Sequence, residues 1–293
     1  MAKDLAAVGA TATWSTFDTG ADLATAFLSN KVDILTSVTA VPMVPLIAND
    51  VPFKIVYVTD TSVNDDEIVA KDSIHSMKDL VGQKVSYSSG TGQQYAFDTA
   101  AKVAGLSPGK FQNIDLPPQD GTAALLRGSV DAASLYQPYA DQVAATRGFH
   151  VLYTDSQLTQ ATHGSYAVAD FVAVKTSYIQ AHPKIIQAFV KALSQGAQLY
   201  QSDPAKAASL SWKQDGAPNS SAALGLLKTS VYPTLSQQIT SAYLGKPGSP
   251  GKLASVIENI AAFEKQLGTT SVTISLSQAQ QLLDPSLAMA AGG

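Results

Sequence analysis

Apolar and polar positions along the middle of the chain follow two alternating periods. Short apolar or alternating runs favour β-strands, and the longer segments between them repeat apolar residues every three or four positions, which is typical of helices. Strands are predicted at 84–88, 111–116, 130–136 and 150–154, with a helix after each of the first three. Strands that alternate with helices predict a parallel sheet covered by helices on both faces.

The first part of the chain follows the same plan. Strands are predicted at 11–17, 32–37 and 53–60, and a helix at 21–30 lies between the first two. Thr19 and Asp22 have the spacing of a helix-capping box. Beyond Pro183 the chain is predicted to be mostly helical, because long segments there keep helical spacing of their apolar residues.

Two ten-residue segments share one pattern. Residues 26–35 (AFLSNKVDIL) and 124–133 (ALLRGSVDAA) each predict a helix end, a residue suited to a left-handed cap, and a strand that opens with Val-Asp. The two copies are too far apart for a solenoid repeat. Their similarity favours two α/β lobes built on one plan, and chance similarity is the alternative.

Composition narrows the classes of function. The chain has 293 residues, 14% charged residues and a formal net charge of −4, so it offers no electrostatic reason to bind nucleic acid. It has no cysteine, which excludes disulfides and thiolate sites. No apolar run approaches the roughly 18 residues of a membrane span, and the first residues lack the pattern of a signal peptide. An exported protein with this sequence would therefore be a mature or truncated form.

A glycine-rich stretch, YSSGTGQQY at 87–95, lies between a predicted strand and a predicted helix. Glycines at such a turn let an anion approach the free N–H groups of the helix start, although a simple helix cap is the alternative. Two further strand ends, at 36–43 and 135–139, combine small or polar residues with a helix start. Since ligands of open α/β sheets bind beyond the carboxyl ends of the strands, the pattern predicts an anion-binding cleft between lobes.

Catalytic and metal-binding motifs are missing. The four histidines are scattered and form no His-Glu-x-x-His pattern, and no Gly-x-Ser-x-Gly elbow occurs. Acidic residues are too dispersed to nominate an acid–base pair. These absences favour a binding protein with no catalytic residue, metal or cofactor over an enzyme.

Three stretches carry a resemblance to a known family: residues 14–34, residues 167–192 and YPTLSQQIT at 232–240. The chain resembles the substrate-binding proteins of ABC importers for taurine, nitrate and alkanesulfonates, and is most similar to the taurine-binding members. The resemblance implies a monomer in the periplasm or outside the cell that passes a small ligand to a membrane permease. It also implies the two-lobed type II periplasmic-binding fold, whose lobes close over the ligand.

The resemblance implies a division of the chain into 1–77 (first part of lobe 1), 78–172 (lobe 2) and 173–293 (return to lobe 1 and C-terminal helices). Crossings between the lobes are expected near 66–72 and 166–175. Family members begin with a strand and a helix that have no counterpart here. The chain is therefore expected to lack an N-terminal strand–helix unit, together with the ligand contacts that this unit makes.

Seven residues match positions that bind the ligand in the family. The anion is expected at two helix starts, an aromatic residue walls the cleft, and a carboxylate faces the ligand amine; the residues are Thr39, Ala40, Thr91, Gly92, Gln93, Tyr136 and Asp170. Asp170 lies in an otherwise apolar strand, where a carboxylate is costly without a partner. A salt bridge or a surface strand end is the alternative role for Asp170.

Taurine fits this set of residues. Its sulfonate stays ionised at any ordinary pH, so neutral N–H and hydroxyl donors can hold it, and its ammonium needs one negative partner. Nitrate and a pyrimidine precursor of thiamine are alternative ligands within the same fold, and Asp170 argues against nitrate. An enzyme on a similar two-lobed scaffold is a third, less favoured alternative.

Overall fold

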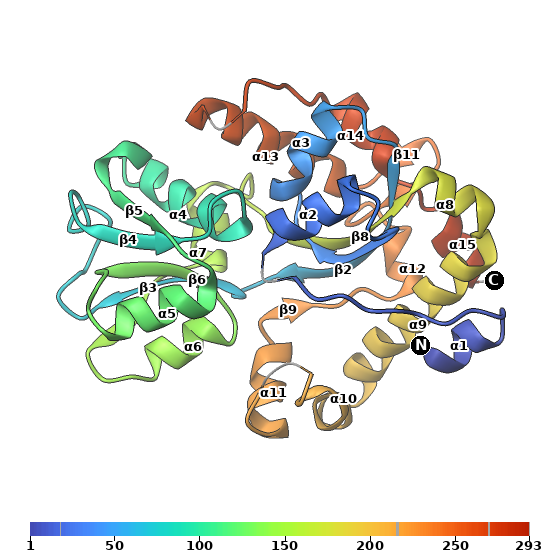
Figure 1. Cartoon of the computed structure of the whole chain (residues 1–293), viewed down its shortest axis with the longest axis horizontal. Coiled ribbons are helices and arrows are strands. Elements are labelled where there is room, and N and C mark those ends of the chain that lie inside the picture. Colours follow the sequence, from blue (N-terminus) through green and yellow to red (C-terminus); the bar gives the residue numbers. More distant parts are fainter. Residues whose placement is uncertain (18, 215–216, 269, 293) are drawn as a thin grey trace. The chain divides into compact units, whose positions relative to one another are not determined.

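The computed structural model describes residues 1–17, 19–214, 217–268 and 270–292. The chain forms two units of mixed helices and strands, and each contains its own sheet. Unit 1 comprises Met1–Thr61, Ala169–Leu227 and Val231–Gly293, and unit 2 comprises Ser62–Val168 and Lys228–Ser230. In Figure 1 the cyan and green elements form unit 2, and the blue and yellow-to-red elements form unit 1.

The sheet of unit 1 has four strands in the order β1 (Ile34–Val38), β8 (Ala169–Lys175), β2 (Phe53–Ser62) and β9 (Ser230–Val231). β8 runs antiparallel to both β1 and β2. The predicted strands at 32–37 and 53–60 are confirmed. The predicted strand at 11–17 is wrong: this segment belongs to no ladder of the described strands, because a pocket separates it from β1.

Helices surround this sheet. They are α1 (Ala2–Ala6), α2 (Gly20–Leu28), α3 (Val44–Ala48), α8 (Thr176–Ala181), α9 (Pro183–Ser202), α10 (Pro204–Ser211), α11 (Ser220–Leu227), α12 (Leu235–Gln238), α13 (Leu253–Leu267), α14 (Leu276–Leu282) and α15 (Ser286–Gly292). A 3-10 helix, Val41–Met43, precedes α3, and a hairpin joins β10 (Gly245–Lys246) to β11 (Ser249–Pro250). The helical character predicted beyond Pro183 is confirmed.

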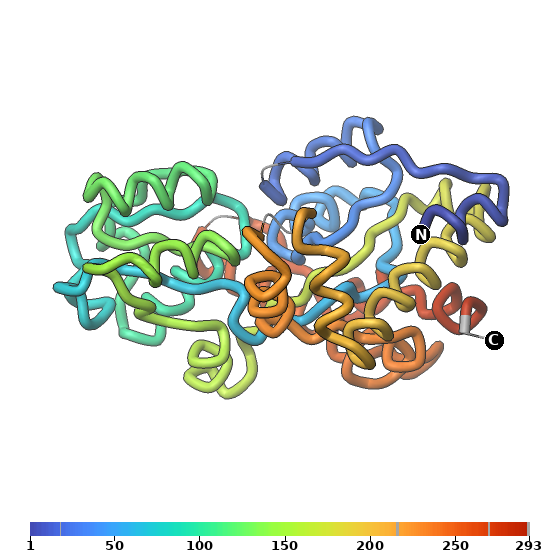
Figure 2. The backbone as a smooth tube through the Cα atoms, turned by 90° about the horizontal axis from the view of Figure 1, so that it is seen from below, coloured from blue at the N-terminus to red at the C-terminus, as the bar shows by residue number. Residues whose placement is uncertain are grey.

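Helix α9 packs against the sheet of unit 1 and against several of its helices. Its buried residues Ile186, Phe189 and Val190 lie in one apolar cluster with Val172 and Val174 of β8. Helices α1 and α15 also contact α9, so both chain ends pack on the same helix (Figure 2). Proline at the first position of α9 suits its start, because the missing N–H would have no partner there.

The predicted cap of α2 is confirmed. The Thr19 hydroxyl oxygen accepts a hydrogen bond from the Asp22 N–H at 3.1 Å, which satisfies one of the free donors of the first turn. None of the helices in the described ranges is long and apolar enough to cross a membrane.

The sheet of unit 2 has five strands in the order β5 (Gln112–Asp115), β4 (Lys84–Tyr87), β6 (Ala132–Tyr136), β3 (Asp66–Lys71) and β7 (Phe149–Thr154). Its helices are α4 (Gly92–Val103), α5 (Pro118–Leu126), α6 (Tyr139–Ala144) and α7 (Asp155–Ala161), with a 3-10 helix at Pro108–Lys110. The predicted alternation of strands and helices between 84 and 154 is confirmed.

The four predicted strands run in one direction, but the sheet also contains one antiparallel strand, β3, that was not predicted. β4 is parallel to β5 and β6, whereas β3 is antiparallel to both β6 and β7. β3 covers most of the segment that was expected to cross between lobes. Its Ile68, Val69 and Ala70 are fully buried, so this segment is an interior strand of unit 2.

Candidate functional site

The turn from β4 into the first residues of α4 contains three of the predicted ligand residues, Thr91, Gly92 and Gln93. Gly90 has a φ of +72°, a left-handed conformation that favours glycine. Thr91 is the extended N-cap residue, and α4 begins at Gly92. The glycine-rich stretch therefore turns the chain sharply from a strand into a twelve-residue helix.

Internal hydrogen bonds use part of this predicted anion site. The Ser89 N–H donates to the Asp115 carboxylate at 3.0 Å, and the Gly90 N–H donates to Gln94 Oε1 at 2.7 Å. The Thr91 hydroxyl donates to the Ser88 carbonyl at 2.6 Å. The N–H groups of the first helical turn have no acceptor within the helix. Together with the positive end of the helix dipole, they are what remains to bind an anion.

The Gln93 side chain brings a carboxylate to this helix start. Gln93 Nε2 donates to Asp66 Oδ1 at 2.6 Å, and Asp66 is only 4% exposed. Asp66 was not predicted as a site residue, because it begins the segment 66–72 that was expected to cross between the lobes. An acidic run directly before an apolar strand was the available signal.

Tyr136 ends β6 and lies directly opposite Asp66 of β3 in the antiparallel ladder. Residues that face each other in this way share one face of the sheet. Its ring also meets the Tyr139 ring edge-on, with 5.5 Å between centroids. Unit 2 thus collects the start of α4, Asp66 and Tyr136 where β4 and β6 end, the edge at which open α/β sheets bind ligands.

The other three predicted residues belong to unit 1. Val38 of β1 pairs with Phe171 of β8, so Thr39 and Asp170 lie at the same end of this sheet. On the other side of β8, Asp170 faces Asp60 of β2 in register. Two carboxylates in such a pair repel each other, and their juxtaposition favours a positively charged neighbour.

Ala40 is buried and forms the N-cap of the 3-10 helix that leads into α3. The helix start predicted at Thr39 and Ala40 is confirmed as a structural feature. Both helices are short, with three and five residues. Their combined dipole is weaker than that of α4, so the N-terminus of α4 attracts an anion more strongly.

Unit 2 also has an acidic interior beside this site. Glu67 is about nine-tenths buried, and among the described residues its Oε2 has no hydrogen-bond partner. Burial, together with the nearby Asp141 and Asp155, raises the pKa of Glu67 to about 7. A carboxyl group in this position holds its proton at mildly acidic pH.

We expect Glu67→Gln to flatten the pH dependence of stability. Unfolded Glu67 ionises near pH 4.5 and folded Glu67 near pH 7. The stability contributed by its neutral form is therefore complete below pH 4.5 and is lost as the pH rises through about 7. The free energy of unfolding should fall by roughly 2–3 kcal/mol over that range in the parent protein.

Urea titrations at pH 4.5 and pH 7.5 measure this difference. The exposed Asp120→Asn variant is the control and should keep the full pH dependence of the parent. Equal pH dependence in Glu67→Gln and the parent would refute the assignment of the shift to Glu67.

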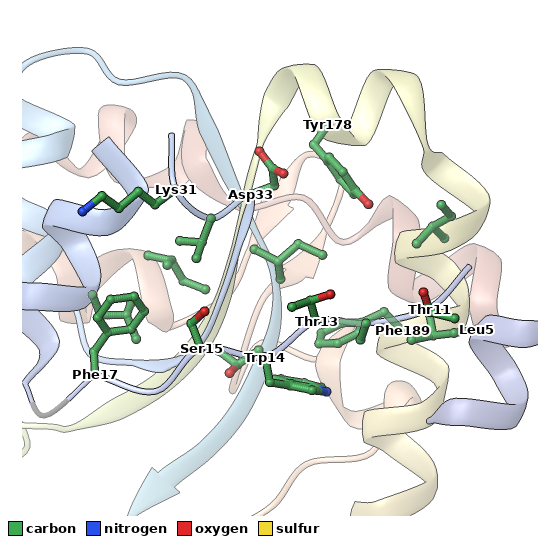
Figure 3. A pocket seen from close by; sticks show the side chains of 17 residues that line it. Leu5, Thr11, Thr13, Trp14, Ser15, Phe17, Lys31, Asp33, Tyr178 and Phe189 are labelled. Carbon is green, nitrogen blue, oxygen red and sulfur yellow. The ribbon is translucent and has the colours of Figure 1, made fainter. Parts of the chain in front are cut away.

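A pocket of about 380 Å³ lies in unit 1, apart from all seven predicted residues. It is lined by the extended segment 11–17, by residues 31–36 and by Tyr178, Ile185 and Phe189 of α8 and α9 (Figure 3). Because consecutive residues from 31 to 36 line it, the pocket faces the outer edge of β1 as well as its faces. Trp14 lies near Phe189, with 6.2 Å between ring centroids.

Within the described part of the chain, no group of three or more His, Cys, Asp or Glu side chains could hold a metal ion.

Comparison with known proteins relates the chain to sulfonate-binding proteins. It is 28% identical over 196 residues to the taurine-binding periplasmic protein of Escherichia coli K12, a match that covers 67% of this chain and 59% of the relative. It is 29% identical over 152 residues to a proposed aliphatic sulfonates-binding protein of the same organism, covering 52% of this chain and 46% of the relative. The chain thus spans about half to three fifths of these relatives, which are named as binding proteins and not as enzymes.

Solved structures share the fold at low sequence identity. The alkanesulfonate-binding protein SsuA from Xanthomonas axonopodis pv. citri, bound to MOPS, aligns with a TM-score of 0.71 and 16% identity over 93% of this chain and 87% of that chain. The desulfurization enzyme DSZB aligns with a TM-score of 0.57 and 13% identity over 87% of this chain and 84% of that chain. The fold alone therefore accommodates both binding and catalysis.

Residues 68–207 match the family described as NMT1/THI5 like. This segment contains five of the seven predicted residues: Thr91, Gly92, Gln93, Tyr136 and Asp170. The resemblance to the periplasmic substrate-binding proteins of the taurine, nitrate and alkanesulfonate group is thus confirmed, and the chain has a periplasmic-binding-protein fold.

Proposed function

We propose that this chain is an extracytoplasmic solute-binding protein that captures a small sulfonate and delivers it to an ABC importer. The observation that carries the proposal is the start of α4, where first-turn N–H groups meet the carboxyl end of β4. A sulfonate stays ionised at ordinary pH, so such neutral donors can bind it without a basic side chain. The names of the two relatives support the same class of ligand.

We further propose that the preferred ligand also carries an ammonium group, as taurine does. The start of α4 borders Asp66 through the Gln93 side chain and Asp115 through the Ser89 N–H. In unit 1, Asp170 faces Asp60. Taken separately, either pair of carboxylates would attract the cationic end of a zwitterion more than a ligand that carries only negative charge.

The same charges argue against nitrate, which has no positive end. A neutral pyrimidine would gain little from a helix start that favours anions. An enzyme is the alternative function on this fold. It would convert its ligand, whereas a receptor returns the ligand unchanged.

A thermal-shift panel distinguishes these ligands. Taurine, ethanesulfonate, nitrate and hydroxymethylpyrimidine would each be added to the purified protein. A ligand present at 100 times its dissociation constant should raise the free energy of unfolding by about 2.7 kcal/mol. We expect the largest shift with taurine and a smaller one with ethanesulfonate. Stabilisation by nitrate or by the pyrimidine alone would refute the sulfonate proposal.

The remaining features of the proposed role follow from transport. The protein would act as a monomer outside the cytoplasm, in the periplasm or at the cell surface, and would dock on a membrane permease while loaded with its ligand.

A further inference from the structure

Asp155 is a buried carboxylate that accepts hydrogen bonds from three other residues of unit 2. It is the first residue of α7 and is only 2% exposed. Asp155 Oδ2 accepts hydrogen bonds from the Ser62 hydroxyl and from the Asp66 N–H, the latter at 2.9 Å. Asp155 Oδ1 accepts a hydrogen bond from the Tyr166 hydroxyl.

Two chains of contacts lead from Asp155 to the first turn of α4. The first passes through Asp66, whose carboxylate accepts the hydrogen bond from Gln93 Nε2 at 2.6 Å. The second passes through Tyr166, whose ring stacks on Tyr95 with 4.9 Å between centroids and 22° between ring planes. Gln93 and Tyr95 both lie in the first turn of α4, so that turn is held at two points.

Asp155 also forms hydrogen bonds near both ends of the segment Ser62–Val168, which makes up most of unit 2. The chain enters this unit at Ser62 and leaves it after Val168. The Ser62 N–H donates to the Val168 carbonyl at 3.0 Å, so the two ends run side by side there. The hydroxyls of Ser62 and Tyr166 donate to Asp155. Ser62 therefore lies where the chain enters unit 2, and Tyr166 lies close to where it leaves this unit.

We propose that Asp155 is a positioning residue that holds the first turn of α4 in the geometry that binds the anion and ties this turn to the entry and exit of unit 2. The inference rests on the proposed function for its ligand, but the positioning itself can be tested without one. Burial raises the pKa of Asp155, so its ionised form is costly for the fold. A carboxylate can accept the hydrogen bonds from Ser62, Asp66 and Tyr166 at the same time.

Asparagine at this position keeps the shape and one acceptor oxygen, and it replaces the other oxygen with an NH₂ donor. The amide NH₂ of Asp155→Asn would donate, and it cannot accept from Ser62, from the Asp66 N–H or from Tyr166 on the side that it occupies. Tyr166→Phe removes one hydrogen bond and keeps the ring stack on Tyr95. It should therefore have a smaller effect than Asp155→Asn.

Amide hydrogen exchange in the absence of ligand tests the positioning directly. In Asp155→Asn, the amides of Tyr95, Ala96 and Phe97 should exchange about tenfold faster than in the parent, while the amides of β4 and β6 keep their protection. Glu264→Gln, which changes a half-buried carboxylate in unit 1, is the control and should leave these rates unchanged. Unchanged exchange in Asp155→Asn, or a uniform increase across unit 2, would overturn the proposal.

A double-mutant cycle on ethanesulfonate affinity tests the connection to the ligand. Asp155→Asn and Gln93→Ala should each weaken binding by about threefold to tenfold, and their combination should weaken it less than the product, because both act on one turn. Multiplicative effects would overturn the route through Gln93. If the parent binds no sulfonate but the exchange result holds, the proposed function fails and the positioning role of Asp155 stands.

Discussion

Replacing Gly92 with proline should weaken the binding of every sulfonate by about 10- to 100-fold. Gly92 is the first residue of α4, where proline is well tolerated, and Thr91 before it is extended, as a residue before proline prefers. The substitution therefore deletes one N–H donor while the helix remains. A hydrogen bond to a charged group contributes about 1.5–3 kcal/mol, and each 1.4 kcal/mol is tenfold in affinity.

Gly92→Ala is the matched control, because it adds a side-chain carbon and retains the N–H. Calorimetric titration with ethanesulfonate should give a dissociation constant for Gly92→Ala close to that of the parent. Equal losses in the two variants would mean that crowding, and not the missing donor, weakens binding. Parent-like affinity in Gly92→Pro would remove this N–H from the anion site.

Replacing Asp170 with asparagine should weaken taurine binding by about 10- to 100-fold, because it removes the charge that we propose meets the ligand ammonium. Ethanesulfonate has no amine and should bind the variant as well as, or better than, the parent. Titrations of both proteins with both ligands measure this crossed pattern.

Asp60→Asn shows which of the two carboxylates meets the amine. If Asp170 meets it, Asp60→Asn should change taurine affinity less than Asp170→Asn does. An equal loss for taurine and ethanesulfonate in Asp170→Asn would instead assign Asp170 a structural role in the sheet.

Local patterns in the sequence predicted most elements of the fold. Helical and strand periods located β4, α4, β6 and α9, and the spacing of Thr19 and Asp22 located the start of α2. The segment 11–17 has alternating polar and apolar residues, but it pairs with none of the described strands, and strand formation depends on such a partner. The antiparallel strand β3 was also missed, because its position in the sheet depends on contacts with β6 and β7 that no local pattern encodes.

The same limit applies to the candidate site. The glycine-rich turn before α4 can be recognised from composition, since its residue types have a direct conformational reason. The roles of Asp66 and Asp155 depend on contacts with residues far along the chain, such as the bond from Gln93 to Asp66 and the bond from Tyr166 to Asp155. Carboxylates that look dispersed in the sequence thus gather around one helix start in the folded unit.

Isothermal titration of the purified chain with taurine, followed by recovery of the ligand, distinguishes a sulfonate receptor from an enzyme and from a protein that binds no sulfonate. We expect saturable binding at one site per chain and recovery of chemically unchanged taurine, with weaker binding of ethanesulfonate. If neither sulfonate gives any heat of binding at millimolar concentration, the result would contradict sulfonate recognition. Conversion of the ligand during the titration would contradict the role of a receptor.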